Sequence, residues 1–94
     1  MKAYELLKNN SAWCQHALAK TKTGKRTSPH SKTATSWCLM GAVEKCYGRA
    51  YSLHKEAALE AIRNHLGIWD CAMWNDEPHR TFKEVRALLK KVNV

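Results

Sequence analysis

The chain has 94 residues, of which 45% are hydrophobic and 26% are charged. This length allows one domain over residues 1–94 and excludes a second domain, and the composition excludes a disordered tail. Sixteen Lys and Arg outnumber eight Asp and Glu, which gives a net charge of +8. Such a balance favours attraction to polyanions and says nothing about the fold.

The first ten residues, MKAYELLKNN, are too polar for a secretory signal, because Glu5 and Lys8 interrupt the apolar residues. No apolar run is long enough to span a membrane either. We therefore expect a cytoplasmic protein with no membrane partner. Its four cysteines are then predicted to be reduced thiols that serve as small apolar fillers, with disulfides as the alternative; they are Cys14, Cys38, Cys46 and Cys71.

Apolar residues cluster over residues 3–7 and are followed by Asn9 and Asn10, a pattern typical of a short amphipathic helix. The next segment, residues 12–19, fits either a strand or a helix capped by Ser11. We favour an extended stretch there, with a small β-hairpin near Trp13 as an option.

Residues 20–35 have no large apolar side chain and include Gly24 and Pro29, so we predict a long exposed loop with a turn at Thr23 and Gly24. No acidic residue lies between Glu5 and Glu44. The segment is therefore a cationic insertion, and its basic side chains are Lys20, Lys22, Lys25, Arg26, His30 and Lys32.

The following apolar run predicts a central helix over residues 37–47, capped by Thr35 or Ser36 and ending at Gly48. A glycine inside such a helix, Gly41, indicates a place where another backbone comes close.

Two more helices follow. Ser52 and Gly67 bound the first of them, whose predicted buried stripe is Leu53, Ala57, Ala61, Ile62 and Leu66. The second begins at a capping box, Thr81 with Glu84 three residues later, and its exposed face carries Lys83, Arg86 and Lys90. The fold class that we predict is mainly α: a compact single domain of three to four helices with a long basic loop.

Signs of catalysis or of a cofactor are weak. Zinc ligands usually come in close pairs such as C-x2-C, which this chain lacks, so we expect no metal and no cofactor. A site assembled from distant residues is the alternative, and its ligands would be Cys14, His16, Cys71 and His79.

Apolar neighbours predict that Cys38 is buried and inert rather than nucleophilic. Trp74 is expected in the core and Asp76 in a turn or cap. We therefore predict no catalytic residue and no enzymatic activity.

The basic residues of the 20–35 segment, together with Lys83, Arg86 and Lys90, could hold a phosphate backbone. Trp13 and Trp37 flank the segment and would stack a base if they are exposed, while burial is the alternative. We predict a binding protein for nucleic acid or a nucleoprotein complex. The alternative is a module that binds a host protein effector and blocks its acidic surface.

Two blocks, W-C-L-M-G-A-V at residues 37–43 and W-N-D-E-P-H-R-T-F-K-E-V-R-A-L-L at residues 74–89, resemble those of a family of small bacterial and phage proteins of unknown function. The resemblance implies a shared scaffold and carries no activity. Occurrence in phages implies an accessory role, including inhibition of a defence nucleoprotein in the manner of a CRISPR inhibitor. The 20–35 segment is richer in lysine than its counterparts in this family, so we expect the individual function to lie there.

Overall fold

The computed structural model describes residues 1–48 and 52–94. Its elements in chain order are α1 (Ala3–Leu6), the 3-10 turn η1 (Asn10–Ala12), β1 (Ala19–Thr21), β2 (Arg26–Thr27), β3 (Ala34–Trp37), α2 (Leu39–Tyr47), α3 (Leu53–Leu66), α4 (Cys71–Asn75) and α5 (Phe82–Val92). Among the described residues, no helix is both long enough and apolar enough to cross a membrane.

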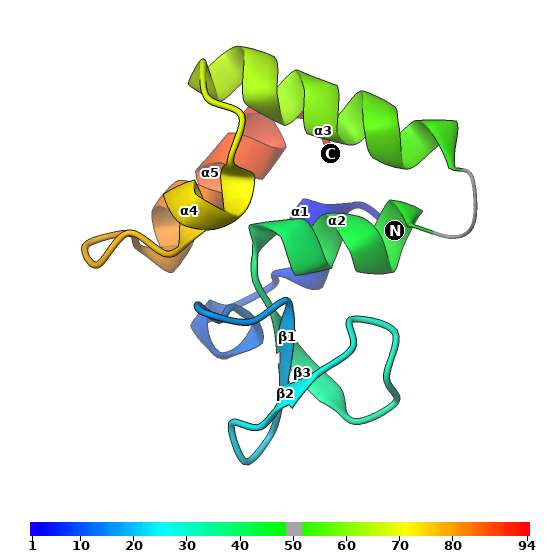
Figure 1. Cartoon of the computed structure of the whole chain (residues 1–94), viewed down its shortest axis with the longest axis vertical. Coiled ribbons are helices and arrows are strands. Elements are labelled where there is room, and N and C mark those ends of the chain that lie inside the picture. The colour runs from blue at the N-terminus through cyan, green and yellow to red at the C-terminus, as the bar shows by residue number, and fades with distance from the viewer. Residues whose placement is uncertain (49–51) are drawn as a thin grey trace.

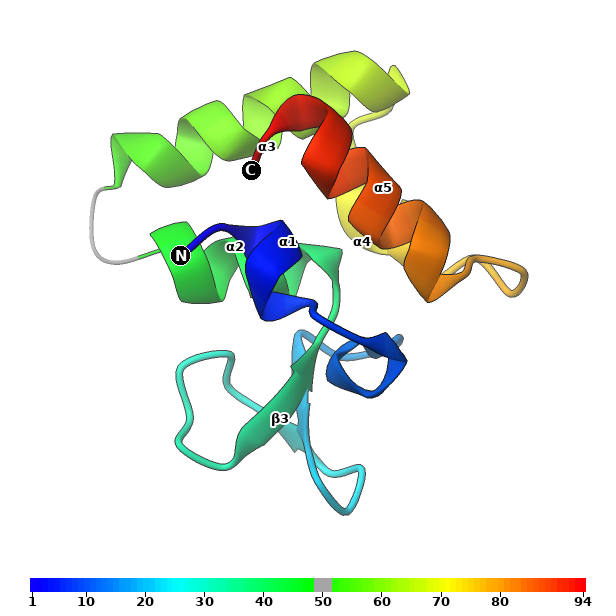
Figure 2. The same cartoon turned by 180° about the vertical axis from the view of Figure 1, so that it is seen from behind.

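The helices form one half of the molecule and the sheet forms the other (Figure 1). Seen from behind, α1 lies against α2, and α5 packs beside α3 (Figure 2). The sheet is antiparallel, with β1 in the centre of the order β2-β1-β3. The chain is thus a mixed α and β fold, with more helices than predicted and with a small sheet in addition.

One hydrophobic cluster holds the helices together. Its fully buried members include Leu39 of α2, Ile62 of α3 and Leu89 of α5. Leu7, which directly follows α1, is also fully buried in it. The β1–β2 hairpin, residues 19–27, contributes nothing to this cluster. Trp13 and Trp37 pack against its edge and are half-buried, so they join the sheet half to the helical half.

The prediction of a long loop at residues 20–35 was wrong. Lys20 pairs with Arg26 on one side and with Ser36 on the other, as part of the antiparallel sheet. Backbone hydrogen bonds and β-branched Thr residues suffice for such short strands, and they require little apolar burial. The predicted turn is confirmed: Gly24 has a φ of 85°, and its N–H donates to the Thr21 carbonyl at 2.9 Å.

Two helix starts also differ from the prediction. Trp37 belongs to β3, because its backbone pairs with Ala19 and its carbonyl accepts from Cys14 N–H at 3.1 Å. The cap of α2 is therefore Cys38, whose sulfur accepts from Gly41 N–H. In the N-terminal segment, Asn9 rather than Ser11 caps a 3-10 turn, and only Ala19 of residues 12–19 lies in a named strand.

The ends of α3 and α5 are confirmed. Ser52 caps α3, Gly67 ends it in the left-handed conformation, and Thr81 and Glu84 form the predicted capping box of α5. The predicted buried stripe of α3 is correct for Ile62 and wrong for Leu53, which is 82% exposed. The other buried residues of this helix are Ala58 and Leu59, which were not predicted.

Gly41 is the contact point between α2 and the chain that enters the sheet. A Cβ at this position would lie 1.7 Å from the Leu18 carbonyl oxygen, which also accepts from Cys38 N–H at 3.1 Å. This confirms the predicted close approach of another backbone. The Leu18 carbonyl can bond the first turn of α2 only because Gly41 has no side chain.

We predict that Gly41→Ala destabilises the protein by about 1–3 kcal/mol, since the added methyl group must push two backbones apart. In a helix without this contact the same change would stabilise by about 0.5–1 kcal/mol. Urea denaturation followed by circular dichroism measures the difference. A stabilised variant would show that the approach of Leu18 is not required.

Candidate nucleic-acid interface

A groove of about 710 Å³ lies between residues 11–16 and the sheet. Its two walls are the segment that contains Trp13 and His16 and the surface formed by β1, β3 and the hairpin turn. None of the lining residues is acidic, and Lys20 and Lys22 are among them. The charged side chains that line the groove are therefore all basic.

The strand register adds a third cation to the same side. Directly opposed residues of antiparallel strands point to the same face of a sheet. Lys20 is opposed by Arg26 on β2 and by Ser36 on β3. Since Lys20 and Ser36 line the groove, Arg26 shares this face. We define the groove face as Lys20, Lys22, Arg26 and the groove beside them.

The buried side chain of Asn75 fixes the outer wall of the groove. Its Oδ1 accepts from Trp13 Nε1 at 2.8 Å and from Leu39 N–H at 3.0 Å. Its Nδ2 donates to the Cys14 carbonyl at 3.2 Å and to Asp76 Oδ1 at 2.9 Å. All four hydrogen-bonding positions of the amide are thus used, and the residue has no exposed surface.

The residues next to Asn75 form further hydrogen bonds with the same wall of the groove. Asp76 Oδ1 accepts from His16 N–H at 2.9 Å, which confirms that Asp76 bonds backbone. Gln15 Nε2 donates to the carbonyls of Asn75 and Glu77, both at 3.0 Å. His16 has a φ of 67°, a conformation uncommon for a residue with a side chain, and its side chain is 65% exposed.

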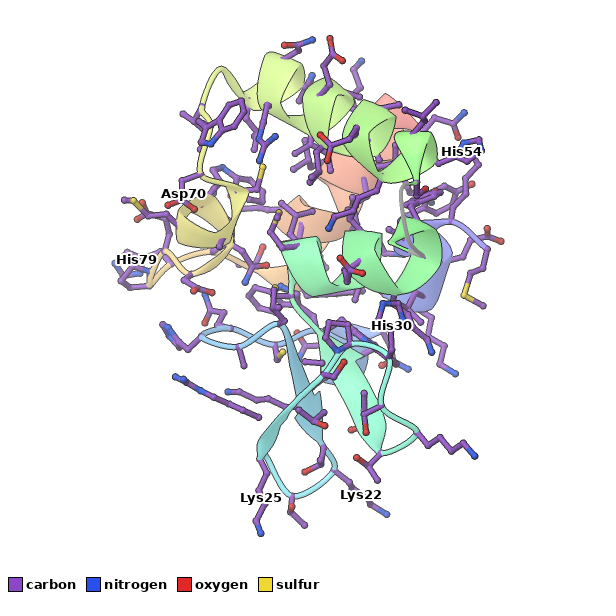
Figure 3. All side chains as sticks on the ribbon, turned by 45° about the vertical axis from the view of Figure 1, so that its right-hand side comes forward. Lys22, Lys25, His30, His54, Asp70 and His79 are labelled. Carbon is purple, nitrogen blue, oxygen red and sulfur yellow. The ribbon has the colours of Figure 1, made fainter. Side chains whose placement is uncertain are left out.

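The remaining basic residues of the 20–35 segment point elsewhere. Lys25 extends away from the molecule at the hairpin tip, near Lys22 of the groove face, whereas His30 lies against α2 (Figure 3). His30 Nε2 is 2.9 Å from Glu44 Oε2, and Lys55 Nζ is 2.6 Å from Glu44 Oε1. Hydrogen bonds from Lys55 and His30 lower the pKa of Glu44, so His30 is tied to the helical half.

Lys32 is exposed in the loop between β2 and β3, which also contains Pro29. There, Trp37 Nε1 donates to the carbonyl of buried Pro29 at 3.0 Å. Successive residues of a strand point to opposite faces, so Trp37 lies on the face opposite to Ser36 and the groove. Trp37 is thereby half-buried and bonded away from the groove.

The predicted basic residues of α5 form a separate surface. Lys83 and Lys90 are exposed, while Arg86 is half-buried and its Nε donates to the Tyr4 carbonyl at 3.2 Å. The helix packs on α1 and α3 and lies apart from the sheet in both views of the fold (Figures 1 and 2). The structure thus divides the predicted basic residues into two faces rather than one.

Four ion pairs occur in the described part of the chain, and they involve His16, His30, Lys55 and Arg80. Lys20, Lys22, Lys25 and Arg26 take part in none of them. The cations of the sheet are therefore not neutralised by the carboxylates of the described residues, and their charge is directed to solvent.

Sequence reasoning named Trp13 as a possible stacking residue but missed Gln15 and His16 as part of the same wall. The signal that could have found it is the W-N-D block, because a buried Asn next to an Asp suggests a side chain that bonds another segment's backbone. Trp69, which is 75% exposed, was also not considered in the sequence analysis. The guanidinium of Arg63 stacks over its ring, 3.7 Å from the ring centre. Trp74 is half-buried under Arg80 rather than fully in the core.

The other chemical candidates are kept apart or buried. All four cysteines are free. No three metal-binding side chains of the described residues come together, and His79 lies in the segment between α4 and α5 (Figure 3). Cys38 is 4% exposed, as predicted, and burial raises the pKa of its thiol to about 11. Burial also raises the pKa of Cys46, which is only half-buried.

We predict that Asn75→Ala lowers the free energy of unfolding by roughly 3 kcal/mol or more. The change leaves Trp13 Nε1, Leu39 N–H and the Cys14 carbonyl without their partner, and each unpaired buried group costs about 1–3 kcal/mol. Asn64→Ala on the exposed side of α3 is the control, expected within about 0.5 kcal/mol of the parent. Equal stabilities of the two variants in urea denaturation would refute the role of Asn75.

The thiols yield a second prediction. In the folded protein, iodoacetamide should modify Cys46 first and Cys38 only as the protein unfolds, because reaction requires an accessible thiolate. Mass spectrometry of digests taken over time measures each rate, and the protein in denaturant serves as the control in which all four react. Rapid modification of native Cys38 would contradict its burial and support a nucleophilic role.

The comparisons with known proteins bear on the scaffold alone. No curated protein and no solved structure matches the chain. The resemblance to a family without an assigned activity is confirmed over almost the whole length. The sequence profile of DUF6197, a family of unknown function, matches residues 1–93, and the chain therefore belongs to that family.

Proposed function

We propose that this protein is a non-enzymatic binding protein that engages nucleic acid, free or within a nucleoprotein complex, through its groove face. The observation that carries the proposal is the register of β1. It sets Lys20 beside Arg26 on one face of the sheet, where Lys20 and Lys22 line a groove that has no carboxylate in its lining. Cations arranged in this way attract phosphates and release their counterions.

The rest of the sheet supports this role. Lys25 extends the same charge to the hairpin tip, and none of the basic side chains of the hairpin belongs to the hydrophobic core. These side chains are therefore not required for folding, and their number is best explained by an external polyanion. About four phosphates would be engaged by Lys20, Lys22, Lys25 and Arg26, which corresponds to a slope of log affinity against log salt of about −3 to −4.

An accessory role against a defence nucleoprotein would be one use of this binding, since such complexes present phosphates as free nucleic acid does. The α5 surface favours a second candidate, a module that covers an acidic protein surface. There Lys83 and Lys90 flank a shallow hollow of about 340 Å³ that half-buried Phe82 lines. A protein partner captured in equal amount with and without nuclease treatment would favour this second candidate.

We predict that the triple variant Lys22→Gln, Lys25→Gln, Arg26→Gln loses most of its affinity for nucleic acid and remains folded. Its salt slope should decrease in magnitude by about 3, because each lost phosphate contact reduces the slope by about 1. Fluorescence anisotropy with labelled oligonucleotides at several salt concentrations measures both quantities.

The matched control removes the same number of charges from α5, as Lys83→Gln, Lys90→Gln and Lys91→Gln. It should keep the slope and most of the affinity of the parent. If the α5 triple variant loses binding and the sheet variant does not, the interface lies on α5. A parent slope near zero would dismiss phosphate binding altogether.

A further inference from the structure

The groove face offers an aromatic ring as well as cations. Trp13 lines the groove and is half-buried. Its ring nitrogen is held by Asn75 Oδ1 at 2.8 Å, and its backbone bridges to Trp37. A residue held both at its ring nitrogen and at its backbone loses little conformational freedom when a ligand stacks on it. Trp13 therefore has the properties of a preorganised stacking platform.

The cations lie in the same groove as this ring. Lys20 and Lys22 line the hollow together with Trp13, and Arg26 lies on the same face of the sheet. Thr35 and Ser36 of β3 also line the groove. Sites for single-stranded nucleic acid combine these two elements, a positive groove for the phosphates and an aromatic side chain for the bases.

A duplex would use this groove poorly. Its bases are stacked and paired, so none of them can reach a half-buried ring inside a hollow without being flipped out. A duplex could still touch the exposed cations at the hairpin tip. Single strands, whose bases are already free to splay, can satisfy the ring and the cations together.

We propose that the groove binds single-stranded nucleic acid, with one base stacked on Trp13 and the neighbouring phosphates on Lys20, Lys22 and Arg26. This inference rests on the proposed function and specifies its ligand. Stacking contacts the flat face of a base, which all bases have, and not its hydrogen-bonding edge. Binding should therefore depend little on sequence.

The first test compares a labelled oligo-dT of about a dozen nucleotides with a labelled hairpin duplex of similar total charge, by fluorescence anisotropy at one salt concentration. We expect the oligo-dT to bind about 10-fold more tightly or better. Duplex binding that equals or exceeds oligo-dT binding would overturn this inference and leave the proposed function in place. Absence of binding to both probes would overturn both.

The second test uses Trp13→Leu with Trp69→Leu as the control, since Trp69 is exposed on the connector before α4. Trp13→Leu should weaken oligo-dT binding about 10-fold or more with an unchanged salt slope, because stacking involves no charge. Trp13→Phe should restore most of the affinity, as it keeps an aromatic face while losing the hydrogen bond to Asn75. Unaltered affinity in folded Trp13→Leu would overturn the stacking role.

If Trp13→Leu does not fold, Lys20→Gln against Lys45→Gln decides the matter. Lys20 lines the groove, whereas Lys45 is exposed at the end of α2. Lys20→Gln should reduce oligo-dT affinity more than duplex affinity, and Lys45→Gln should leave the ratio unchanged. An equal loss for both probes in Lys20→Gln would show that the groove does not select single strands.

Discussion

The structure depends on one buried amide. Asn75 bonds the indole of Trp13, the first backbone N–H of α2 and the carbonyl of Cys14, so a single side chain joins α4, α2 and the wall of the groove. In a chain this short, burial of apolar surface alone gives a modest margin of stability, and a fully satisfied polar network specifies which segments meet. The position of Trp13 relative to the sheet follows from this network.

The same arrangement explains why the W-N-D block stands out in the sequence. Asn75 holds the side chain of Trp13, Asp76 holds the backbone of His16, and the carbonyls of Asn75 and Glu77 hold Gln15. Residues at and just after the end of a five-residue helix thus bind a segment from near the start of the chain. The block is a structural clasp that joins α4 to residues 13–16.

Features with a local cause could be predicted from the sequence. The caps of α3 and α5 were found because Ser52, Gly67 and the Thr81 capping box satisfy neighbouring backbone groups. The close contact at Gly41 was found because glycine weakens a helix interior, so its presence in an apolar helix indicates that a side chain would clash there.

The sequence offered a small β-hairpin near Trp13 only as an option, and the three-stranded sheet was not foreseen. Its strands are two to four residues long and carry no alternating apolar pattern, so their pairing rests on backbone bonds between distant segments. For the same reason the division of the basic residues between two faces could not be inferred: it depends on strand register and on how α5 packs. The ion pair of His30 with Glu44 likewise joins residues that no local pattern connects.

The absence of hairpin residues from the hydrophobic cluster has an evolutionary consequence. Substitutions at Lys20, Lys22, Lys25 or Arg26 can accumulate without a penalty in folding, so natural selection can retune this surface while the helices and the Asn75 clasp stay constant. Members of one family could in this way diverge in their targets and share a scaffold.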